Sequence, residues 1–328
     1  VSLPAILLLL IFGFTAGPVT SFINPNEIFG DLLLPLVSVS VAIILFEGGL
    51  SLKFSEVKEV TSVIRNMVTV GVLVSWVLTS IASYFIFGLG LEISVLLGAV
   101  LVVTGPTVIG PLLRHVRPSG RVGSIIKWEG IVIDPIGAIL AVLVFEFIIS
   151  GGLEKATAQV VISIFKTIIA GTLLGFAGAQ LVVLILRRHW VPDFLQNPVS
   201  LMIVVFVFVA SNVIQVESGL LSVTLMGIAL ANQKKVSIRH IVEFKENLRV
   251  LFISSLFIIL AARLSLDDLS SILNFHGFLF LLLMIVAVRP LSIFISTYLS
   301  DLNLREKLFL SWMAPRGIVA AAVASVFA

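Results

Sequence analysis

Long apolar runs, separated by short stretches that contain charged residues, Gly or Pro, make up nearly the whole chain. Most of these runs reach the roughly 17–25 residues that an α-helix needs to cross the hydrocarbon core of a membrane. None shows the period-two alternation of a membrane barrel, so the pattern predicts an all-α polytopic membrane protein. The eleven predicted spans are 2–18, 31–50, 62–87, 93–113, 124–150, 158–186, 198–215, 220–231, 250–266, 275–299 and 308–328.

The charges of the connecting loops alternate along the chain. Every second loop is basic, and these loops together hold 16 of the 21 Lys and Arg residues. An excess of positive charge marks the cytoplasmic side of a membrane protein. The first and the last span are therefore both expected to run from inside to outside. The opposite loops are mainly acidic and carry Glu27, Glu92, Glu154, Glu217, Asp267 and Asp268.

Composition narrows the class of protein further. The chain is 59% hydrophobic and only 12% charged, with a mean hydropathy of +1.19, which leaves no room for a separate soluble domain. The net charge of +3 is too small to indicate nucleic-acid binding, and the absence of cysteine excludes disulfides and thiol chemistry. No histidine pair has metal-ligand spacing and no Gly-rich phosphate loop is present, so we expect that the protein is not an enzyme and binds no cofactor.

Two of the predicted spans carry residues that interrupt a helix. In the fourth span, Gly105 and Pro106 lie between Thr104 and Thr107, whose oxygens are potential cation ligands. The eleventh span is interrupted at 315–317, where Pro315 and Gly317 flank Arg316. The two spans have opposite predicted orientations. Interrupted helices at corresponding positions of two inverted halves are typical of the substrate site of a membrane transporter.

Asp134 is the most informative residue of the chain, because it lies in the middle of the fifth span. A carboxylate there costs about 2.5–3.5 kcal/mol on insertion scales, so it is expected to have an ion-related function. A buried hydrogen-bonding acid is the alternative. Glu129 lies five residues earlier and projects about 140° away around the helix. We therefore assign Asp134 to the ion path and Glu129 to a structural ion pair, with Arg316 as its expected partner.

Several other features receive simpler interpretations. Glu47, near the cytoplasmic end of the second span, is expected either to face the ion path or to cap its entrance. Arg289 in the tenth span is expected to pair only with a backbone carbonyl. The loop at 236–249 is amphipathic and predicts a helix on the cytoplasmic membrane surface, which we interpret as a connector between spans. Two GxxxG motifs, at 13–17 and 171–175, indicate close helix packing.

Five short motifs together resemble sodium/hydrogen exchangers of the bacterial or archaeal NhaP type, in the cation:proton antiporter superfamily. They are 3–13 (LPAILLLLIFG), 46–50 (FEGGL), 104–106 (TGP), 129–134 (EGIVID) and 315–317 (PRG). The resemblance implies an inverted-repeat fold of thirteen helices with two crossing broken helices, of which this chain holds helices 2 to 12. It also implies a homodimer in the cell (inner) membrane, a core bundle at about 62–150 and 247–328, and dimerisation or scaffold helices at about 1–50 and 157–231.

Three residues depart from the family pattern. Gly105 replaces the aspartate of the Thr-Asp-Pro motif, Gly130 replaces a serine, and Ile133 replaces the asparagine before the essential aspartate. The transported cation is therefore the open point. Because the chain begins with Val and ends inside an apolar run, we expect it to be part of a longer protein. The resemblance implies that the first and last helices of the fold, and any cytoplasmic regulatory tail, lie outside this sequence.

The sequence thus predicts a secondary antiporter, in which Asp134 binds a proton and a monovalent cation in turn. Competition for one carboxylate couples the two fluxes, and a single acid favours electroneutral exchange. We expect Na⁺ rather than K⁺ to be the cation, with Thr104, Thr107 and Glu47 assisting Asp134. The alternatives are a K⁺/H⁺ antiporter and a gated cation channel or sensor with the same fold.

Overall fold

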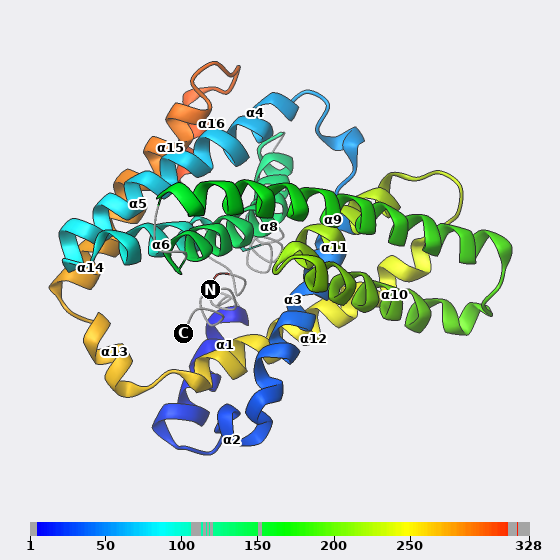
Figure 1. Ribbon diagram of the computed structural model, residues 1–328, viewed down its shortest axis with the longest axis horizontal. Helices are drawn as coiled ribbons and strands as arrows, with labels where there is room; N and C mark the ends of the chain where they lie inside the picture. The colour runs from blue at the N-terminus through cyan, green and yellow to red at the C-terminus, as the bar shows by residue number, and fades with distance from the viewer. Residues whose placement is uncertain are drawn as a thin grey trace. The chain divides into compact units, whose positions relative to one another are not determined.

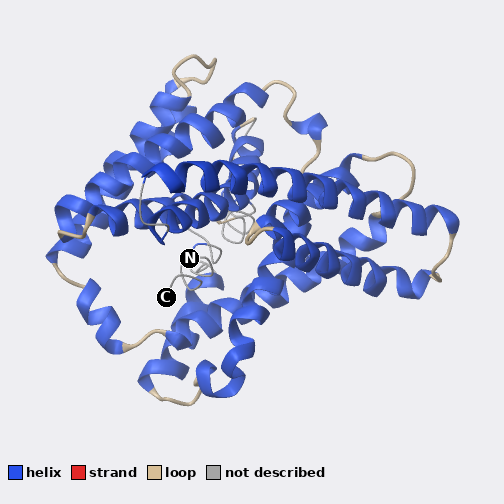
Figure 2. Cartoon of the chain, in the orientation of Figure 1, coloured by secondary structure: helices blue, strands red, loops and turns tan. Residues whose placement is uncertain are grey.

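The computed structural model describes residues 5–105, 113, 116, 118, 121–149, 153–313 and 320. All of the regular structure in these residues is helical (Figure 2). The α-helices are α1 (Ala5–Phe14), α2 (Pro25–Phe29), α3 (Leu33–Leu50), α4 (Thr61–Asn66), α5 (Val72–Phe87), α6 (Leu91–Val102), α8 (Val122–Ile149), α9 (Leu153–Arg188), α10 (Asp193–Ile214), α11 (Ser218–Asn232), α12 (Arg239–Arg263), α13 (Leu266–Ile272), α14 (Phe275–Leu283), α15 (Arg289–Ser296) and α16 (Leu304–Trp312).

Short helices of other types join some of these elements. Two are 3-10 turns, at Gly30–Leu32 and Phe54–Glu56. Three are π-helical turns: η1 (Thr15–Val19) follows α1 and ends that helix, whereas η4 (Met67–Gly71) and η5 (Met284–Val288) lie inside otherwise continuous helices. The π-turn η4 therefore connects α4 to α5, and η5 connects α14 to α15, without ending either membrane helix.

Among the described residues, six helical segments are long and apolar enough to cross a membrane, and three more apolar helices are shorter. The six are Pro25–Leu50, Thr61–Phe87, Val122–Ile149, Ile162–Arg188, Asp193–Ile214 and Phe275–Ser296. The prediction of an all-helical multi-pass membrane protein is confirmed, whereas the count of eleven spans stays a prediction. Much of the eleventh span lies outside the described residues.

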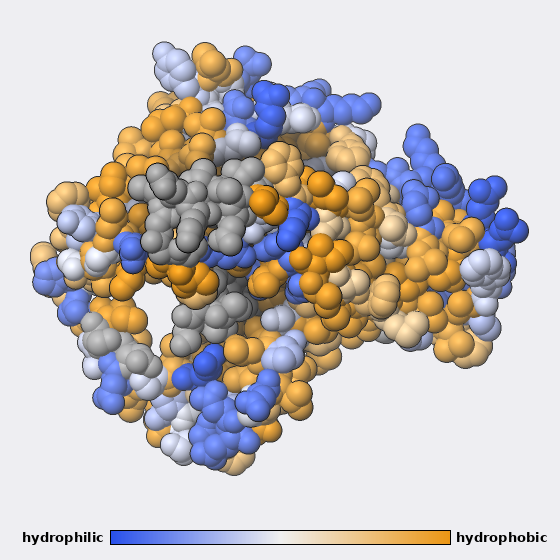
Figure 3. Space-filling model, viewed as in Figure 1, coloured by the Kyte–Doolittle hydropathy of each residue, from blue (hydrophilic) through white to orange (hydrophobic). Residues whose placement is uncertain are grey.

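The exposed surface is that of a protein embedded in lipid. Large apolar side chains such as Phe85, Phe206 and Val213 are exposed on the helices. Apolar residues cover much of the face seen in Figure 3, and most of the hydrophilic residues lie toward its margins. This pattern follows from the surrounding hydrocarbon, which favours apolar side chains on the outside of a membrane protein.

One compact unit comprises residues 38–58 and 138–253. Within it, α9, α10 and α11 pack alongside one another (Figure 1). A Cβ at Gly175 would lie 2.5 Å from the carbonyl oxygen of Ser222, so α9 and α11 approach closely only because this residue is glycine. Gly49 of α3 makes a similar approach to Thr224 of α11. The interpretation of the 171–175 motif as a packing motif is confirmed.

The second unit comprises residues 1–37, 59–137 and 254–328. Here the first GxxxG motif packs against α12. A Cβ at Gly13 would lie 2.5 Å from the carbonyl oxygen of Ile258, and a Cβ at Gly17 would lie 2.4 Å from that of Ala262. α5 packs against α6, and the indole N–H of Trp76 donates a hydrogen bond to the carbonyl oxygen of Val95 at 3.0 Å. The division into a core bundle and a dimer scaffold stays a prediction.

The amphipathic segment at 236–249 does not form a separate surface helix. It continues into the next predicted span as the single helix α12, Arg239–Arg263. The separation predicted from the sequence is wrong because no Gly or Pro interrupts this stretch, and its charged residues are compatible with a continuing helix.

Candidate functional site

Asp134 lies in the middle of α8, a helix that stays continuous although Pro135 is inside it. Its side chain is 0% exposed. Neither carboxylate oxygen has a hydrogen-bond partner among the described residues. Burying a bare charge without a partner is very unfavourable, so this position favours a carboxyl group that holds a proton or a cation.

The end of α6 lies against the same turn of α8. The helix stops at Val102, and Val103, Thr104 and Gly105 leave the helical conformation. A Cβ at Gly137, three residues after Asp134, would lie 2.5 Å from Cγ2 of Val103. The interruption predicted in the fourth span is therefore present at its described end, whereas Pro106 and Thr107 lie outside the described residues.

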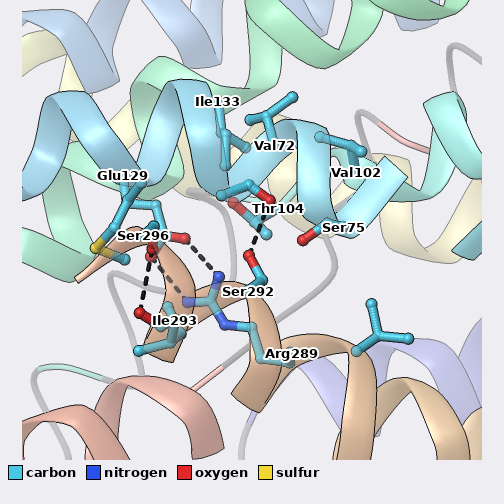
Figure 4. A pocket seen from close by; sticks show the side chains of 13 residues that line it. Val72, Ser75, Val102, Thr104, Glu129, Ile133, Arg289, Ser292, Ile293 and Ser296 are labelled. Atoms are coloured by element: carbon cyan, nitrogen blue, oxygen red, sulfur yellow. Dashed lines mark hydrogen bonds and ion pairs between the residues drawn. The ribbon is translucent and has the colours of Figure 1, made fainter. Parts of the chain in front are cut away.

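Glu129 forms a buried ion pair with Arg289 of α15 (Figure 4). Nη1 of Arg289 donates to Oε1 of Glu129 at 2.5 Å, and Nη2 donates to Oε2 at 2.9 Å. Nη2 also donates to the carbonyl oxygen of Met313 at 3.2 Å. Two parallel hydrogen bonds of this kind fix both the distance and the orientation of the pair.

This pairing changes two interpretations of the sequence. The expectation that Arg289 pairs only with a backbone carbonyl is wrong, because its guanidinium engages both oxygens of Glu129. The expected partner Arg316 lies outside the described residues, as do Pro315 and Gly317, so a contact between Glu129 and Arg316 is untested. The signal for Arg289 was its position, since it is a charged residue inside an apolar span and Pro290 follows it.

A small cavity lies beside this ion pair (Figure 4). Thr104, Glu129, Ile133 and Arg289 line it. Three serine hydroxyl groups also face it, and these come from Ser75 of α5 and from Ser292 and Ser296 of α15. The sequence interpretation missed these serines, because the spacing that places Ser292 and Ser296 on the face of Arg289 is recognisable only once Arg289 is known to point inward.

Glu47 forms an ion pair with Arg249 inside the other unit. Nη1 of Arg249 donates to Oε2 of Glu47 at 2.8 Å, and the glutamate is buried. Glu47 is thus near the end of α3, as predicted, and its charge is balanced by α12. Its assignment to the ion path stays a prediction.

A third ion pair lies on the predicted cytoplasmic side, outside the spans. Arg121 donates to both carboxylate oxygens of Glu306 at 3.1 Å and to the carbonyl oxygen of Asp301 at 2.6 Å. The hydrogen bond from Arg121 lowers the pKa of Glu306 below its usual value of 4.5, against a smaller opposing effect of burial. Glu306 also completes a capping box with Asn303 at the start of α16. The pair fixes the beginning of α8 to the first turn of α16.

The described residues contain no group of three or more His, Asp or Glu side chains that could hold a metal ion. The chemistry that they do present is a single buried carboxyl group without a partner, next to an interrupted helix and a fixed ion pair. Such an arrangement can exchange one monovalent ion for another. It offers no pair of groups for acid–base catalysis.

Comparisons with known proteins agree with this interpretation. A sequence model of the family described as "Sodium/hydrogen exchanger, transmembrane" matches residues 1–328. A Methanocaldococcus jannaschii protein named "Probable Na(+)/H(+) antiporter 2" is 24% identical over 99% of this chain and 79% of its own length. Proteins named K⁺/H⁺ antiporters in Shewanella baltica and Alkalimonas amylolytica are 26% and 27% identical, and the chain spans only 55% and 54% of them.

The fold also matches that of a solved structure. The structure of the sodium proton antiporter MjNhaP1 from Methanocaldococcus jannaschii at pH 8 superposes with a TM-score of 0.84. The match covers 99% of this chain and 80% of the antiporter, at 24% sequence identity. At that identity the superposition establishes a shared fold.

Proposed function

This chain belongs to the sodium/hydrogen exchanger family, and from that premise we propose that it exchanges a monovalent cation for protons across the cell membrane. Asp134 binds the proton and the cation in turn. The observation that carries this proposal is the carboxyl group of Asp134, which is fully buried and has neither oxygen engaged among the described residues. A site that must accept two different ions in alternation needs such a group.

The other buried acids support a one-for-one exchange. Glu129 and Glu47 each have an arginine partner, so their charges are balanced within the protein. Asp134 is then the group whose charge changes during the cycle, and one proton leaves for each monovalent cation that binds. Thr104 and Thr107 supply further oxygens, and Glu47 contributes only when Arg249 releases it.

We propose Na⁺ as the transported cation and K⁺ as the alternative. The relative that this chain covers most fully among those described above carries a name that includes Na(+)/H(+), and shorter matches carry K(+)/H(+). The lack of side-chain oxygens at Gly105, Gly130 and Ile133 makes coordination by water and backbone more important here. That arrangement favours a modest affinity.

The membrane architecture follows the same proposal. Eleven spans would correspond to helices 2–12 of a thirteen-helix inverted-repeat fold, with broken helices crossing near 105 and 316. A core bundle at about 62–150 and 247–328 would move against scaffold helices at about 1–50 and 157–231 in a homodimer. Alternating access of this kind exposes a fixed site to each side in turn.

The decisive experiment is an exchange assay in proteoliposomes with an internal pH-sensitive dye and external Na⁺, K⁺ or Li⁺. The Asp134→Asn variant should lose cation-dependent proton flux completely, because asparagine can neither release a proton nor balance a cation. Asp267→Asn changes an exposed acid in α13 and serves as the matched control. Full exchange by Asp134→Asn would refute the proposal. A large current without proton coupling would instead indicate a channel.

A further inference from the structure

Two π-helical turns border the cavity beside the Glu129–Arg289 pair. Met67 and Gly71 belong to η4, and Val288 belongs to η5, and all three line the cavity. A π-turn changes the hydrogen-bond pattern of its helix, and such turns occur frequently at functional sites. Here the carbonyl oxygen of Gly71 accepts a hydrogen bond from the hydroxyl of Ser292 at 2.8 Å. α15 is therefore held against η4 by a polar contact within the membrane.

Two polar atoms on the cavity wall lack a hydrogen-bond partner in the described part of the chain. They are Oγ1 of Thr104 and Nε of Arg289. Thr104 is 5% exposed and Arg289 is 6% exposed, so bulk water does not reach either side chain freely. Buried polar groups are nearly always hydrogen-bonded, and ordered water commonly provides the bond when protein does not.

The dimensions of the cavity suit one water molecule. Its volume open to water is about 10 Å³, which corresponds to room for about one molecule. The charges of Glu129 and Arg289 balance each other, so a bare cation would face the guanidinium and an anion would face the carboxylate. A neutral molecule that both donates and accepts hydrogen bonds fits this environment best.

We propose that this cavity is a hydration site, which holds one water molecule between Thr104 at the end of α6 and Arg289 of α15. The water accepts a hydrogen bond from Nε–H of Arg289. It donates one hydrogen to Oγ1 of Thr104 and the other to the hydroxyl oxygen of Ser292 or Ser296. Those oxygens are free to accept, because both serines donate their own hydrogen to a backbone carbonyl (Figure 4).

The water has a structural consequence for the interrupted helix. Thr104 directly follows Val103, the residue that contacts α8 at Gly137. A water-mediated link from Thr104 to Arg289 therefore ties the end of α6 to the ion pair that Arg289 makes with Glu129. The proposal depends on the geometry of this unit and does not depend on the transport activity.

Radiolytic footprinting tests the site directly, because X-ray pulses generate hydroxyl radicals from bound as well as bulk water. Met67 lines the cavity and is 2% exposed, whereas Met226 is 0% exposed and does not line it. In the full chain in nanodiscs, we expect Met67 to be oxidised several-fold faster than Met226. Equal, near-zero oxidation of both methionines would overturn the proposal.

Cavity-filling variants provide the second arm. A Cβ at Gly71 would lie 3.3 Å from Oγ of Ser292 and 3.5 Å from Oγ of Ser296, so Gly71→Ala occupies part of the cavity. Its Met67 oxidation should fall to the level of Met226. Gly123→Ala is the control, since its Cβ meets only Pro118, at an ordinary 3.5 Å or more.

A third variant keeps the test decisive if Gly71→Ala does not fold. Thr104→Val preserves the shape of the side chain and removes the hydroxyl that the water would bind. It should also lower Met67 oxidation, and Thr104→Ser should restore it. Undiminished Met67 oxidation in Thr104→Val would mean that the radicals come from water elsewhere, and the proposal would be wrong. None of these readouts requires measurable exchange.

Discussion

Two turns of α8 carry buried carboxyl groups in opposite situations. Glu129 is 3% exposed and has both oxygens bound by Arg289, whereas Asp134, 0% exposed, has neither oxygen bound by a described residue. The two residues are five positions apart on one helix, so burial alone does not distinguish them. What distinguishes them is the neighbouring segments. α15 supplies the guanidinium of Arg289 to Glu129, whereas the described end of α6 approaches the next turn of α8 with the side chain of Val103.

The contrast indicates how one helix can serve two purposes. A buried carboxylate held by an arginine keeps its charge and contributes a fixed contact between helices. A buried carboxyl group without such a partner is free to change its ligand. A buried carboxyl group therefore serves as a structural contact or as an ion-binding group, depending on which side chains the rest of the fold places beside it.

The sharpest test of this contrast compares the stabilities of two neutralised variants. Glu129→Gln leaves the Arg289 charge buried without its partner, and loss of one partner of a buried pair typically costs about 3–5 kcal/mol. Asp134→Asn removes a group that has no partner and should leave the free energy of unfolding nearly unchanged. Denaturation in detergent measures both, with exposed Glu92→Gln as the control. Similar losses for Glu129→Gln and Asp134→Asn would remove the distinction.

Glu47 extends the comparison to the other unit. Its partner Arg249 has a side chain that is 19% exposed and can turn partly toward water. Glu47→Gln should therefore cost less, about 1.5–3 kcal/mol, the range for a hydrogen bond to a charged group. Exchange per folded molecule should fall less than in Asp134→Asn. Complete loss of exchange in a stably folded Glu47→Gln would place this residue with Asp134 as a carrier.

Gly137 offers a test of the backbone beside Asp134. A Cβ here would lie 2.5 Å from Cγ2 of Val103 and would push the end of α6 away from α8. Overpacking of this kind typically costs about 1–3 kcal/mol. We expect Gly137→Ala to slow exchange as well, because Thr104 moves with Val103. Gly123→Ala, in the same helix, should have little effect on either measurement, and an equal effect would argue against a specific contact.

The smallest effect is expected at the partly buried pair of Arg121 and Glu306, which lies outside the predicted spans. Because Arg121 lowers the pKa of Glu306, the pair stabilises the folded state above the usual glutamate value of 4.5 and loses this contribution as the pH falls through the lower, folded-state pKa. The stability difference between wild type and Arg121→Gln should be at most about 1 kcal/mol at pH 7.

The same difference should disappear in acid and shrink in high salt. Thermal unfolding at pH 7 and below pH 4 measures it, and exposed Arg305→Gln is the control. A difference that grows on acidification would contradict the assigned direction of the pKa shift. The pair also shows how little a partly exposed ion pair contributes to stability compared with the buried pair at Glu129.

The sequence was sufficient for features that depend on one segment at a time. Asp134 was recognisable because it is an isolated acid in a long apolar run, and the break after Val102 was recognisable from Gly105 and Pro106. The angle between Glu129 and Asp134 also follows from helix geometry alone. These inferences need no knowledge of neighbouring helices.

Features that depend on packing between distant segments were less accessible. Arg289 lies 160 positions from Glu129, and only the folded chain shows that the two meet. Arg249 and Glu47 are likewise 202 positions apart. The continuity of α12 through its charged first turns was missed because loop charge and helix continuity give conflicting signals in the same stretch. The roles of Thr107 and Arg316 stay predictions, since both lie outside the described residues.

Pro135 affects how easily α8 bends next to Asp134. Because proline has no amide hydrogen, it cannot bond to the carbonyl oxygen of Ile131 one turn earlier, and α8 loses stiffness there. The boundary between the two compact units also falls in this helix, after Gly137. The turn of α8 that bends most easily therefore adjoins Asp134. Bending of this helix is concentrated at the carboxyl group of Asp134, and the turn at Glu129, which Arg289 holds, stays in place.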